Sequence, residues 1–168
     1  MTAKEIYERV RELCPGGVGE LDEQGLEPFF KVDPAGLKEV CLALRDDAAL
    51  KFDVLSDLTA VDRPTENVIQ VVYHLYSYEP RQEIVVKAEV DRDAARIATV
   101  EDVWKVANWF EREVFDLFGV VFEGHSDLRR ILLPEDWVGY PLRKDFVEQE
   151  EYDGISTERE PLVPENMR

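Results

Sequence analysis

Residues 67–90, NVIQVVYHLYSYEPRQEIVVKAEV, decide the fold because they predict two long strands joined by a tight turn. In the second half, every second residue from Ile84 to Val90 is apolar, and Lys87 and Glu89 fall on the opposite face. The first half is apolar on both faces, which predicts a central strand covered on both sides. The short connection YEPRQ favours a hairpin and therefore antiparallel pairing.

Further helices and strands are predicted on the N-terminal side of this hairpin. A capping box formed by Thr2 and Glu5 predicts the start of an amphipathic helix, and Pro34 after Asp33 is typical of a second helix start. The expected elements are, in chain order, a helix over residues 2–13, a flexible acidic stretch to about Gly25, a strand over 26–32, a helix from Asp33 and a strand over 51–61.

On the C-terminal side, the sequence predicts a third helix. It begins near Thr99, where Asp102 completes a capping pattern, and it ends at Gly119. With the elements above, this gives an α+β fold: a two-layer domain, residues 1–120, in which helices pack on a mostly antiparallel sheet. The chain then continues as a long extended stretch over residues 121–168, which we call the C-terminal segment.

The charge of the chain excludes several classes of function. The 168 residues carry a formal net charge of −17, whereas nucleic acids and anionic lipid surfaces attract proteins with positive fields. The negative charge favours solubility, with docking onto basic partner surfaces as the alternative. No apolar run is long enough for a membrane span, and the charged first residues lack the apolar block of a signal peptide. We therefore expect a protein that is cytoplasmic and soluble, or peripheral on another structure.

Metal and disulfide chemistry are equally disfavoured by the sequence. Cys14 and Cys41 form no Cys-x-x-Cys pair, and His74 and His125 are the only histidines. Cys41 lies in an apolar helical pattern, as expected of a small core residue. We therefore expect neither a metal centre nor a disulfide framework on this chain.

The C-terminal segment carries a dense set of apolar and aromatic residues up to Phe146, which is unlike the composition of a disordered region. Burying a large apolar side chain contributes about 1.5–3 kcal/mol, and ordering one residue of backbone costs about 1–2 kcal/mol. We therefore expect order only where most of these side chains are covered, by the domain or by a second protein. The acidic residues from Glu148 onward are expected to form a loose, solvated tail.

The end of the third helix and the residues after it supply the candidate site. Glu111 and Glu113 suggest acid/base catalysis, but side chains two positions apart on a helix point away from each other. We favour a structural role in which these glutamates bind arginines of the C-terminal segment. Arg112 and Asp116 are expected on the outer face of the helix. The basic candidates are Arg129, Arg130, Arg143 and Lys144.

Other residues of the C-terminal segment have more than one interpretation. His125 could be a base or a ligand, but a turn-stabilising role is favoured because no cysteine or second histidine lies nearby. The run from Arg143 to Asp145 could grip a phosphate, but a bridge to a partner or to the domain itself is favoured. Aromatic side chains dominate the energetics of many interfaces. The candidates for contact with a partner are Phe122, Leu132, Trp137, Tyr140 and Phe146.

Residues 111–146, EREVFDLFGVVFEGHSDLRRILLPEDWVGYPLRKDF, resemble the signature of one family, the thirty-kilodalton subunit, also called C, of NADH:quinone oxidoreductase, respiratory complex I. The upstream stretch ATVEDVWKVANW is similar to that family as well. Ser126 and Val147 depart from the pattern, because proline is common at both positions. The charged positions of the motif are kept.

The resemblance implies a structural subunit with no catalytic residue, no flavin and no iron–sulfur cluster of its own. FMN, iron–sulfur clusters, NADH and quinone belong to the complex as a whole, a translocase that couples electron transfer from NADH to quinone with proton translocation. The family's subunit lies in the peripheral arm, on the cytoplasmic side of the bacterial inner membrane. Its neighbours are subunits D, B and I: it packs against D, which forms the quinone site with B, and it lies near I.

Two alternatives remain open at this point. Related domains occur in membrane-bound hydrogenases and other complexes that are similar to complex I, and the motif does not fully separate these from an NADH-oxidising complex. A free-standing enzyme that uses the region from Glu111 to Arg143 is the second alternative. Activity of the isolated chain would favour it.

Overall fold

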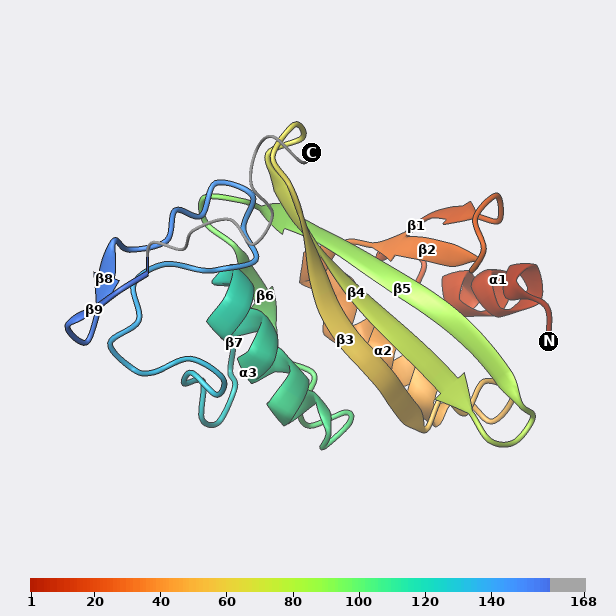
Figure 1. The fold of residues 1–168 in the computed structure, drawn as a ribbon. Helices are drawn as coiled ribbons and strands as arrows, with labels where there is room; N and C mark the ends of the chain where they lie inside the picture. The colour runs from red at the N-terminus through yellow and green to blue at the C-terminus, as the bar shows by residue number, and fades with distance from the viewer. Residues whose placement is uncertain (158–168) are drawn as a thin grey trace, which may run out of the picture.

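The computed structural model describes residues 1–157, which form one five-stranded sheet with helices packed on one face (Figure 1). The elements up to the sheet's third strand are α1 (Ala3–Leu13), β1 (Val18–Asp22), β2 (Phe29–Val32), a 3-10 turn (Pro34–Gly36), α2 (Leu37–Asp46) and β3 (Val54–Arg63). The remaining elements are β4 (Val68–Ser77), β5 (Gln82–Asp91), β6 (Arg96–Ala98), α3 (Ala107–Phe118), β7 (Val121–Glu123), β8 (Glu151–Tyr152) and β9 (Ile155–Ser156).

The sheet has the strand order β1-β2-β5-β4-β3. The predicted hairpin is confirmed: β4 and β5 pair antiparallel along their whole length, with Tyr73 opposite Val86. β3 pairs antiparallel with β4 and β1 pairs antiparallel with β2, whereas β2 and β5 run parallel. The α+β class with a mostly antiparallel sheet is therefore confirmed, with one parallel pair that the sequence did not indicate.

The core lies between the sheet and its helices. Alternate residues of β4, from Ile69 to Leu75, are buried against α1 and α2, and Cys41 is fully buried among them. The opposite face of β4 carries His74 and Tyr76, which are only half-buried. Gln70 and Val72 on that same face are buried, so the prediction that this strand is covered on both sides is wrong only toward its end, at His74 and Tyr76. All three helices contribute to one core on the other face.

The N-terminal region matches the sequence prediction at the helix and departs from it afterwards. Thr2 and Glu5 form the predicted capping box at the start of α1. The stretch to Gly25 was expected to be flexible, but Val18–Asp22 forms the edge strand β1 on β2. Its side chains are largely exposed, so backbone pairing rather than an apolar face forms this strand, and the sequence carries little signal for it.

The start of α3 differs from the prediction. The helix begins at Ala107 instead of near Thr99, and the residues just before Thr99 form β6, which pairs parallel with β7. The Thr99 hydroxyl accepts a hydrogen bond from the Glu101 backbone N–H, so it forms a local turn and not the predicted cap. The helix ends at Gly119, as predicted, with that glycine in the left-handed conformation (φ 76°).

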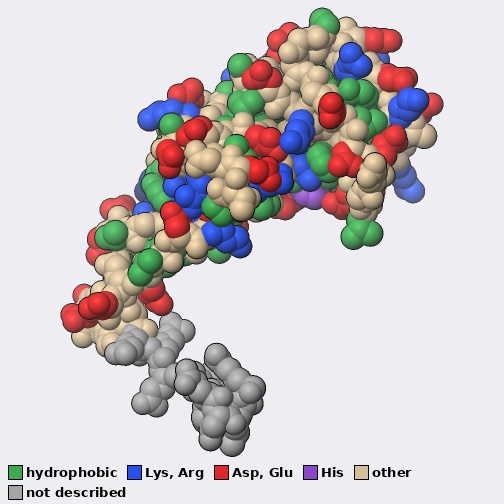
Figure 2. All heavy atoms as spheres, turned by 90° about the horizontal axis from the view of Figure 1, so that it is seen from above, with side chains coloured by type: hydrophobic (Ala, Val, Ile, Leu, Met, Phe, Trp, Pro, Cys, Tyr) green, Lys and Arg blue, Asp and Glu red, His purple; other side chains and the backbone are tan. Residues whose placement is uncertain are grey.

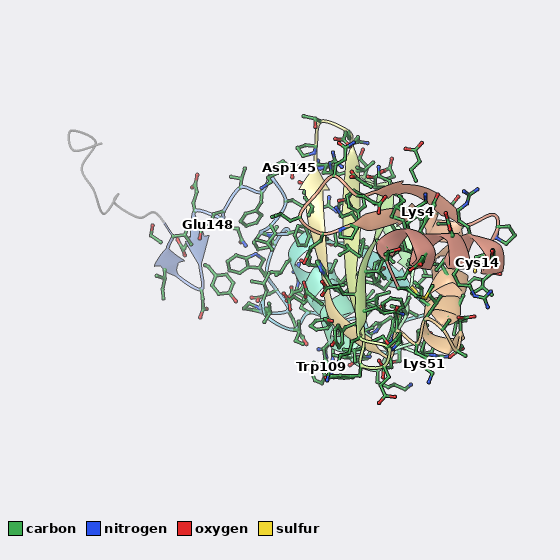
Figure 3. The ribbon with its side chains drawn as sticks, turned by 90° about the vertical axis from the view of Figure 1, so that its right-hand side faces the viewer. Lys4, Cys14, Lys51, Trp109, Asp145 and Glu148 are labelled. Carbon is green, nitrogen blue, oxygen red and sulfur yellow. The ribbon has the colours of Figure 1, made fainter. Side chains whose placement is uncertain are left out.

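The C-terminal segment leaves α3 at the edge of the sheet formed by β3 (Figure 1). Figure 3 shows Asp145 and Glu148 to one side of the strands and Lys4 and Cys14 to the other. The segment meets the sheet at Asp62, which lies on the same face of β3 as the buried residues Leu58 and Ala60. None of the helices within residues 1–157 has the length and apolarity needed to cross a membrane.

Candidate partner-binding site

The carboxylate of Asp116 holds the first part of the C-terminal segment against α3. Its Oδ2 accepts hydrogen bonds from the backbone N–H groups of Ile131, Leu132 and Leu133, at 3.0, 2.7 and 2.9 Å. Its Oδ1 lies 2.7 Å from Nη1 of Arg130, and the side chain of Asp116 is fully buried. Burial acts to raise the pKa of this carboxyl, but the four hydrogen bonds together hold the pKa below its usual value.

Arg130 extends this connection along the segment. Its Nη2 donates to the carbonyl oxygens of Trp137 and Gly139, at 3.0 and 3.2 Å, and its guanidinium lies 5.5 Å from the centre of the Tyr140 ring. Nη1 also donates to the backbone oxygen of Asp116 near the end of α3. One arginine therefore fixes residues 137–140 relative to the helix.

Arg112 lies under the segment as well. Its Nε and Nη2 donate to the carbonyl oxygens of Arg129 and Arg130, at 3.1 and 3.2 Å. The expectation that Arg112 and Asp116 lie on the outer face of the helix is therefore wrong. The two residues do share one face, four positions apart, but the C-terminal segment covers that face and Arg112 is 8% exposed.

A further set of contacts closes over the C-terminal end of α3. The backbone N–H of Leu142 donates to the carbonyl oxygen of Leu117 at 3.1 Å, and Nε of Arg143 donates to that of Phe118 at 2.6 Å. The Tyr140 ring lies over Gly119, where a Cβ atom would be 2.5 Å from the ring. These contacts satisfy carbonyl groups that a helix end leaves without intrahelical partners.

Asp62 and Arg92 connect the segment to the sheet. Arg92 binds Asp62 through Nε at 2.7 Å and Asp145 through Nη2 at 2.6 Å, and the backbone N–H of Lys144 donates to Asp62 at 2.7 Å. Sequence reasoning missed Asp62 and Arg92. A signal was present, because Asp62 continues the alternation of buried residues Leu58 and Ala60 along β3, and an acidic residue at a buried position needs a partner.

Glu111 does not bind an arginine, contrary to the prediction. Its carboxylate accepts hydrogen bonds from the Thr99 hydroxyl and, at 2.7 Å, from the backbone N–H of Val100. Burial raises the pKa of Glu111 to about 7. Glu113 is exposed and forms no ion pair with any residue of 1–157, so the prediction that it binds an arginine is wrong too.

His125 has the turn-stabilising role that the sequence favoured. Its Nδ1 accepts a hydrogen bond from the backbone N–H of Asp127 at 3.0 Å, and its Nε2 lies 3.1 Å from the carbonyl oxygen of Asn108 on α3. Nε2 is also 3.9 Å from Glu111, and neither side chain is accessible to solvent. Both side chains are thus closed off from solvent and hydrogen-bonded to the chain itself.

The described residues also contain no cluster of three or more histidine, cysteine, aspartate or glutamate side chains placed to hold a metal ion. Lys144 makes its contact with Asp62 through the backbone and leaves its side chain exposed. Arg129 pairs with Asp127 on the surface. The basic residues of the segment thus bind mostly backbone carbonyl groups and two buried aspartates.

The apolar side chains of the segment are covered unequally. Phe122 is 2% exposed and belongs to the core of the domain, so it is not free to contact a partner. Trp137, Tyr140 and Phe146 are half-buried, and Leu132 is 61% exposed. Within the part of the segment that the structure describes, the large apolar side chains that remain exposed are Leu132, Val138, Leu142, Val147 and Ile155. Figure 2 shows hydrophobic side chains along the segment where it projects from the body of the molecule.

The acidic end of the segment was expected to be loose, but its described part forms a small hairpin of β8 and β9. The Tyr152 hydroxyl donates to Asp136 at 3.0 Å, and the Tyr152 ring lies 5.3 Å from the Trp137 ring. The rest of the expected tail, residues 158–168, lies outside the described residues.

The geometry therefore divides the segment into two sides. Its inner side is fixed to α3 and β3 by charged and backbone groups, and its outer side presents leucine and valine side chains to solvent. The segment covers fewer apolar side chains than the sequence argument required, and hydrogen bonds to Asp116, Arg112 and Asp62 hold it to the domain. An apolar outer side of this kind is typical of a surface that binds another protein.

Comparisons with known proteins agree with one another. A family model described as respiratory-chain NADH dehydrogenase, 30 Kd subunit, matches residues 30–152. The C subunit of the NADH-quinone oxidoreductase of Chlorobium phaeobacteroides is 44% identical over 151 residues, which cover 89% of this chain and 91% of that protein.

Two solved structures are similar to the chain. A chain of the membrane-bound sulfane sulfur reductase, an archaeal respiratory membrane complex, has a TM-score of 0.72 and 32% identity and covers 86% of this chain and 85% of its own length. A trypsin-resistant fragment of Nqo5 has a TM-score of 0.64 and 31% identity and covers 76% of this chain and all of its own length.

Proposed function

Because the chain belongs to the family of the 30 Kd subunit of respiratory-chain NADH dehydrogenase, we propose that it is a structural subunit of a proton-translocating NADH:quinone oxidoreductase. In this proposal the chain lies in the peripheral arm on the cytoplasmic side of the membrane and meets the membrane only through the complex. Its role is to hold neighbouring subunits in place while the complex transfers electrons from NADH to quinone.

The single observation that supports this role is the division of the C-terminal segment into a polar inner side and an apolar outer side. The inner side is already bound to Asp116, Arg112 and Asp62, so the segment does not need its apolar side chains for attachment to its own domain. Leu132, at 61% exposed, therefore remains available to a partner, and burying such side chains favours association. The proposed partners are the quinone-site subunits D and B, with D as the first contact, and I is a further neighbour.

We further propose that this chain carries no cofactor and no catalytic residue. Glu111 on α3 and His125 after it are a buried acid and base, and both are occupied by hydrogen bonds to the chain itself. FMN, the iron–sulfur clusters, NADH and quinone are bound by other subunits in this proposal.

A second candidate is the equivalent subunit of a complex with a different electron donor or acceptor. It is favoured by the likeness to a chain of the sulfane sulfur reductase, which has the higher TM-score of the two structures above. The higher identity to the Chlorobium protein, 44%, favours the NADH-oxidising complex.

One experiment tests both candidates. The full chain with an affinity tag is expressed in its native cell, and the assembly that copurifies from solubilised membranes is identified by mass spectrometry. We expect subunits D, B and I together with subunits that bind NADH and FMN. A complex without the NADH-binding subunits would favour the second candidate, and a chain that purifies alone with an activity of its own would contradict both.

A further inference from the structure

A groove lies on the open face of the sheet, on the side away from the helices. One wall is the connection between β1 and β2 at Leu26–Pro28, and the floor is formed by β4 and β5 where His74, Tyr76 and Val85 point outward. The groove encloses about 230 Å³, enough for one or two side chains. It is separate from the contacts that hold the C-terminal segment, and nothing in the proposed role above uses it.

The groove has the side chains of a protein interface. Leu26 is fully exposed on its wall, at 106%, although a leucine at the tip of a connection costs solvation free energy there. The rings of Tyr76 and Tyr78 pack edge to face with centres 5.3 Å apart, and Tyr78 is 64% exposed. Tyrosine is enriched at the energetically dominant positions of interfaces.

The charge of the groove selects the kind of partner. Glu27 and Glu83 line it, and the described residues that line it include no lysine or arginine. His74 Nδ1 lies 3.7 Å from Glu27, beyond hydrogen-bond distance, so the imidazole is only a weak partner for that carboxylate. Two carboxylates beside two tyrosine rings fit a guanidinium better than an ammonium, because arginine binds carboxylates in a bidentate way and stacks on aromatic faces.

The groove lies on a different face of the sheet from the contacts of the C-terminal segment. The floor residues alternate along their strands with core residues such as Tyr73, so the groove is on the sheet face opposite to α1. The segment reaches the sheet at Asp62, which shares the core face of β3 with Leu58 and Ala60. The groove and the outer side of the segment are therefore two separate surfaces for partners.

We propose that this groove is a second docking surface, which takes a segment of a partner subunit in which an arginine lies within three residues of a large apolar residue. The apolar side chain packs between Leu26 and Val85, and the arginine lies over the tyrosine rings and pairs with Glu27 and Glu83. This inference rests on the proposed function, since it requires the multisubunit complex.

The test uses the whole complex, purified through a tag on another subunit. The photoreactive residue p-benzoylphenylalanine replaces Leu26, or replaces Glu8 on the exposed face of α1 as a control, and cross-linked peptides are identified by mass spectrometry. We expect the residue at position 26 to cross-link to a segment of one other subunit that contains the arginine and the apolar residue. The residue at position 8 gives no such product.

Charge reversal then tests the proposed recognition. Glu27→Arg with Glu83→Arg is expected to lower the yield of the cross-link from position 26 at least tenfold. The matched control, Glu8→Arg with Glu12→Arg on α1, makes the same change in net charge and leaves the yield within twofold.

Several results would overturn the inference. They are the absence of a cross-link from position 26 to another subunit, a partner segment without arginine, a product with residues 158–168 of the same chain or with a second copy, and a yield unaffected by charge reversal. The subunit composition of the purified complex reports separately on the proposed function, so the two proposals fail in different measurements.

Discussion

The Asp116 carboxylate lies 2.7 Å from the Arg130 guanidinium in a site where Asp116 is fully buried, and this pair fixes how the C-terminal segment leaves the domain. A buried ion pair stabilises a fold only when its remaining hydrogen-bonding positions are filled. Here three consecutive backbone N–H groups, from Ile131 to Leu133, fill the second oxygen. The site is thus an anion cradle built by the segment itself.

Asp116→Ala is expected to destabilise the segment strongly. It leaves one buried guanidinium and three N–H groups without their acceptor, so the free energy of unfolding should fall by about 3–5 kcal/mol. Amide hydrogen exchange of the isolated chain should accelerate at Ile131, Leu132 and Leu133, and urea unfolding gives the free energy.

The matched control for this prediction is Asp127→Ala. Asp127 pairs with Arg129 at 2.9 Å, but the two side chains are 53% and 66% exposed, so the loss should stay below about 1 kcal/mol. If the two substitutions lowered the free energy of unfolding equally, or if amide exchange at Leu132 were unchanged in Asp116→Ala, Asp116 would not hold the segment as described.

Gly119→Ala is expected to loosen the segment through a different contact. The residue has a positive φ of 76°, and a Cβ atom there would lie 2.5 Å from the Tyr140 ring, so the ring must move. The left-handed conformation costs a non-glycine residue about 1–2 kcal/mol, and displacing a packed ring adds about 1–3 kcal/mol. Thermal unfolding of the isolated chain measures the sum.

Gly124→Ala separates the cost of the left-handed conformation from the cost of displacing a ring. Its φ is 85°, but the nearest atom to a new Cβ, Cγ2 of Thr99, is 3.5 Å away, an ordinary contact. Only the conformational cost of about 1–2 kcal/mol should appear. If the two alanine variants were equally stable, the Tyr140 ring would not be packed on Gly119 as described.

Glu111→Gln is expected to change how stability depends on pH. Burial raises the pKa of Glu111 in the folded chain to about 7, above its ordinary value of 4.5. Between these values the unfolded chain loses the proton first, so the contribution of Glu111 to stability is full below pH 4.5 and is lost as pH rises through about 7. A shift of this size corresponds to about 3 kcal/mol.

Glutamine mimics the protonated acid, so the variant does not lose this contribution to stability as the pH rises. The free energy of unfolding of Glu111→Gln relative to the unmodified chain should therefore rise between pH 5 and pH 8, by up to about 3 kcal/mol. Urea unfolding at pH values across this range measures the difference. A constant difference would show that Glu111 has the same pKa in the folded and unfolded chains.

The sequence was a good guide to the β4–β5 hairpin, to the start of α1 and to the C-terminal end of α3, because those features depend on local patterns. Alternation from Ile84 to Val90 and the capping box at Thr2 act within a few residues. β1 and the parallel pairing of β2 with β5 were missed, because they depend on backbone partners far along the chain. The alternation of apolar residues within one strand does not determine which other strand it pairs with.

The candidate site shows the same division. The sequence correctly indicated that charged groups at the end of α3 hold the basic residues that follow, but it assigned Glu111 to that role instead of Asp116. Glu111 and Asp116 are five positions apart on α3. Which of the two carboxylates binds the C-terminal segment depends on the path that the segment takes over the helix. Asp62 lies eighty-two residues from Lys144, a contact beyond any local pattern.

Leu132→Ser combined with Leu142→Ser is expected to weaken assembly without weakening the fold. The side chains are 61% and 48% exposed, so their loss should change the free energy of unfolding by less than about 0.5 kcal/mol. In the complex they would be buried, and the amount of the quinone-site subunits D and B that copurifies with the chain should fall at least about tenfold, a loss of about 1.4 kcal/mol in binding. Val106→Ser is the matched control, because Val106 is 41% exposed and lies at the N-terminal end of α3, outside the segment. Full copurification of both partners with the double variant would show that the outer side of the segment does not contact them.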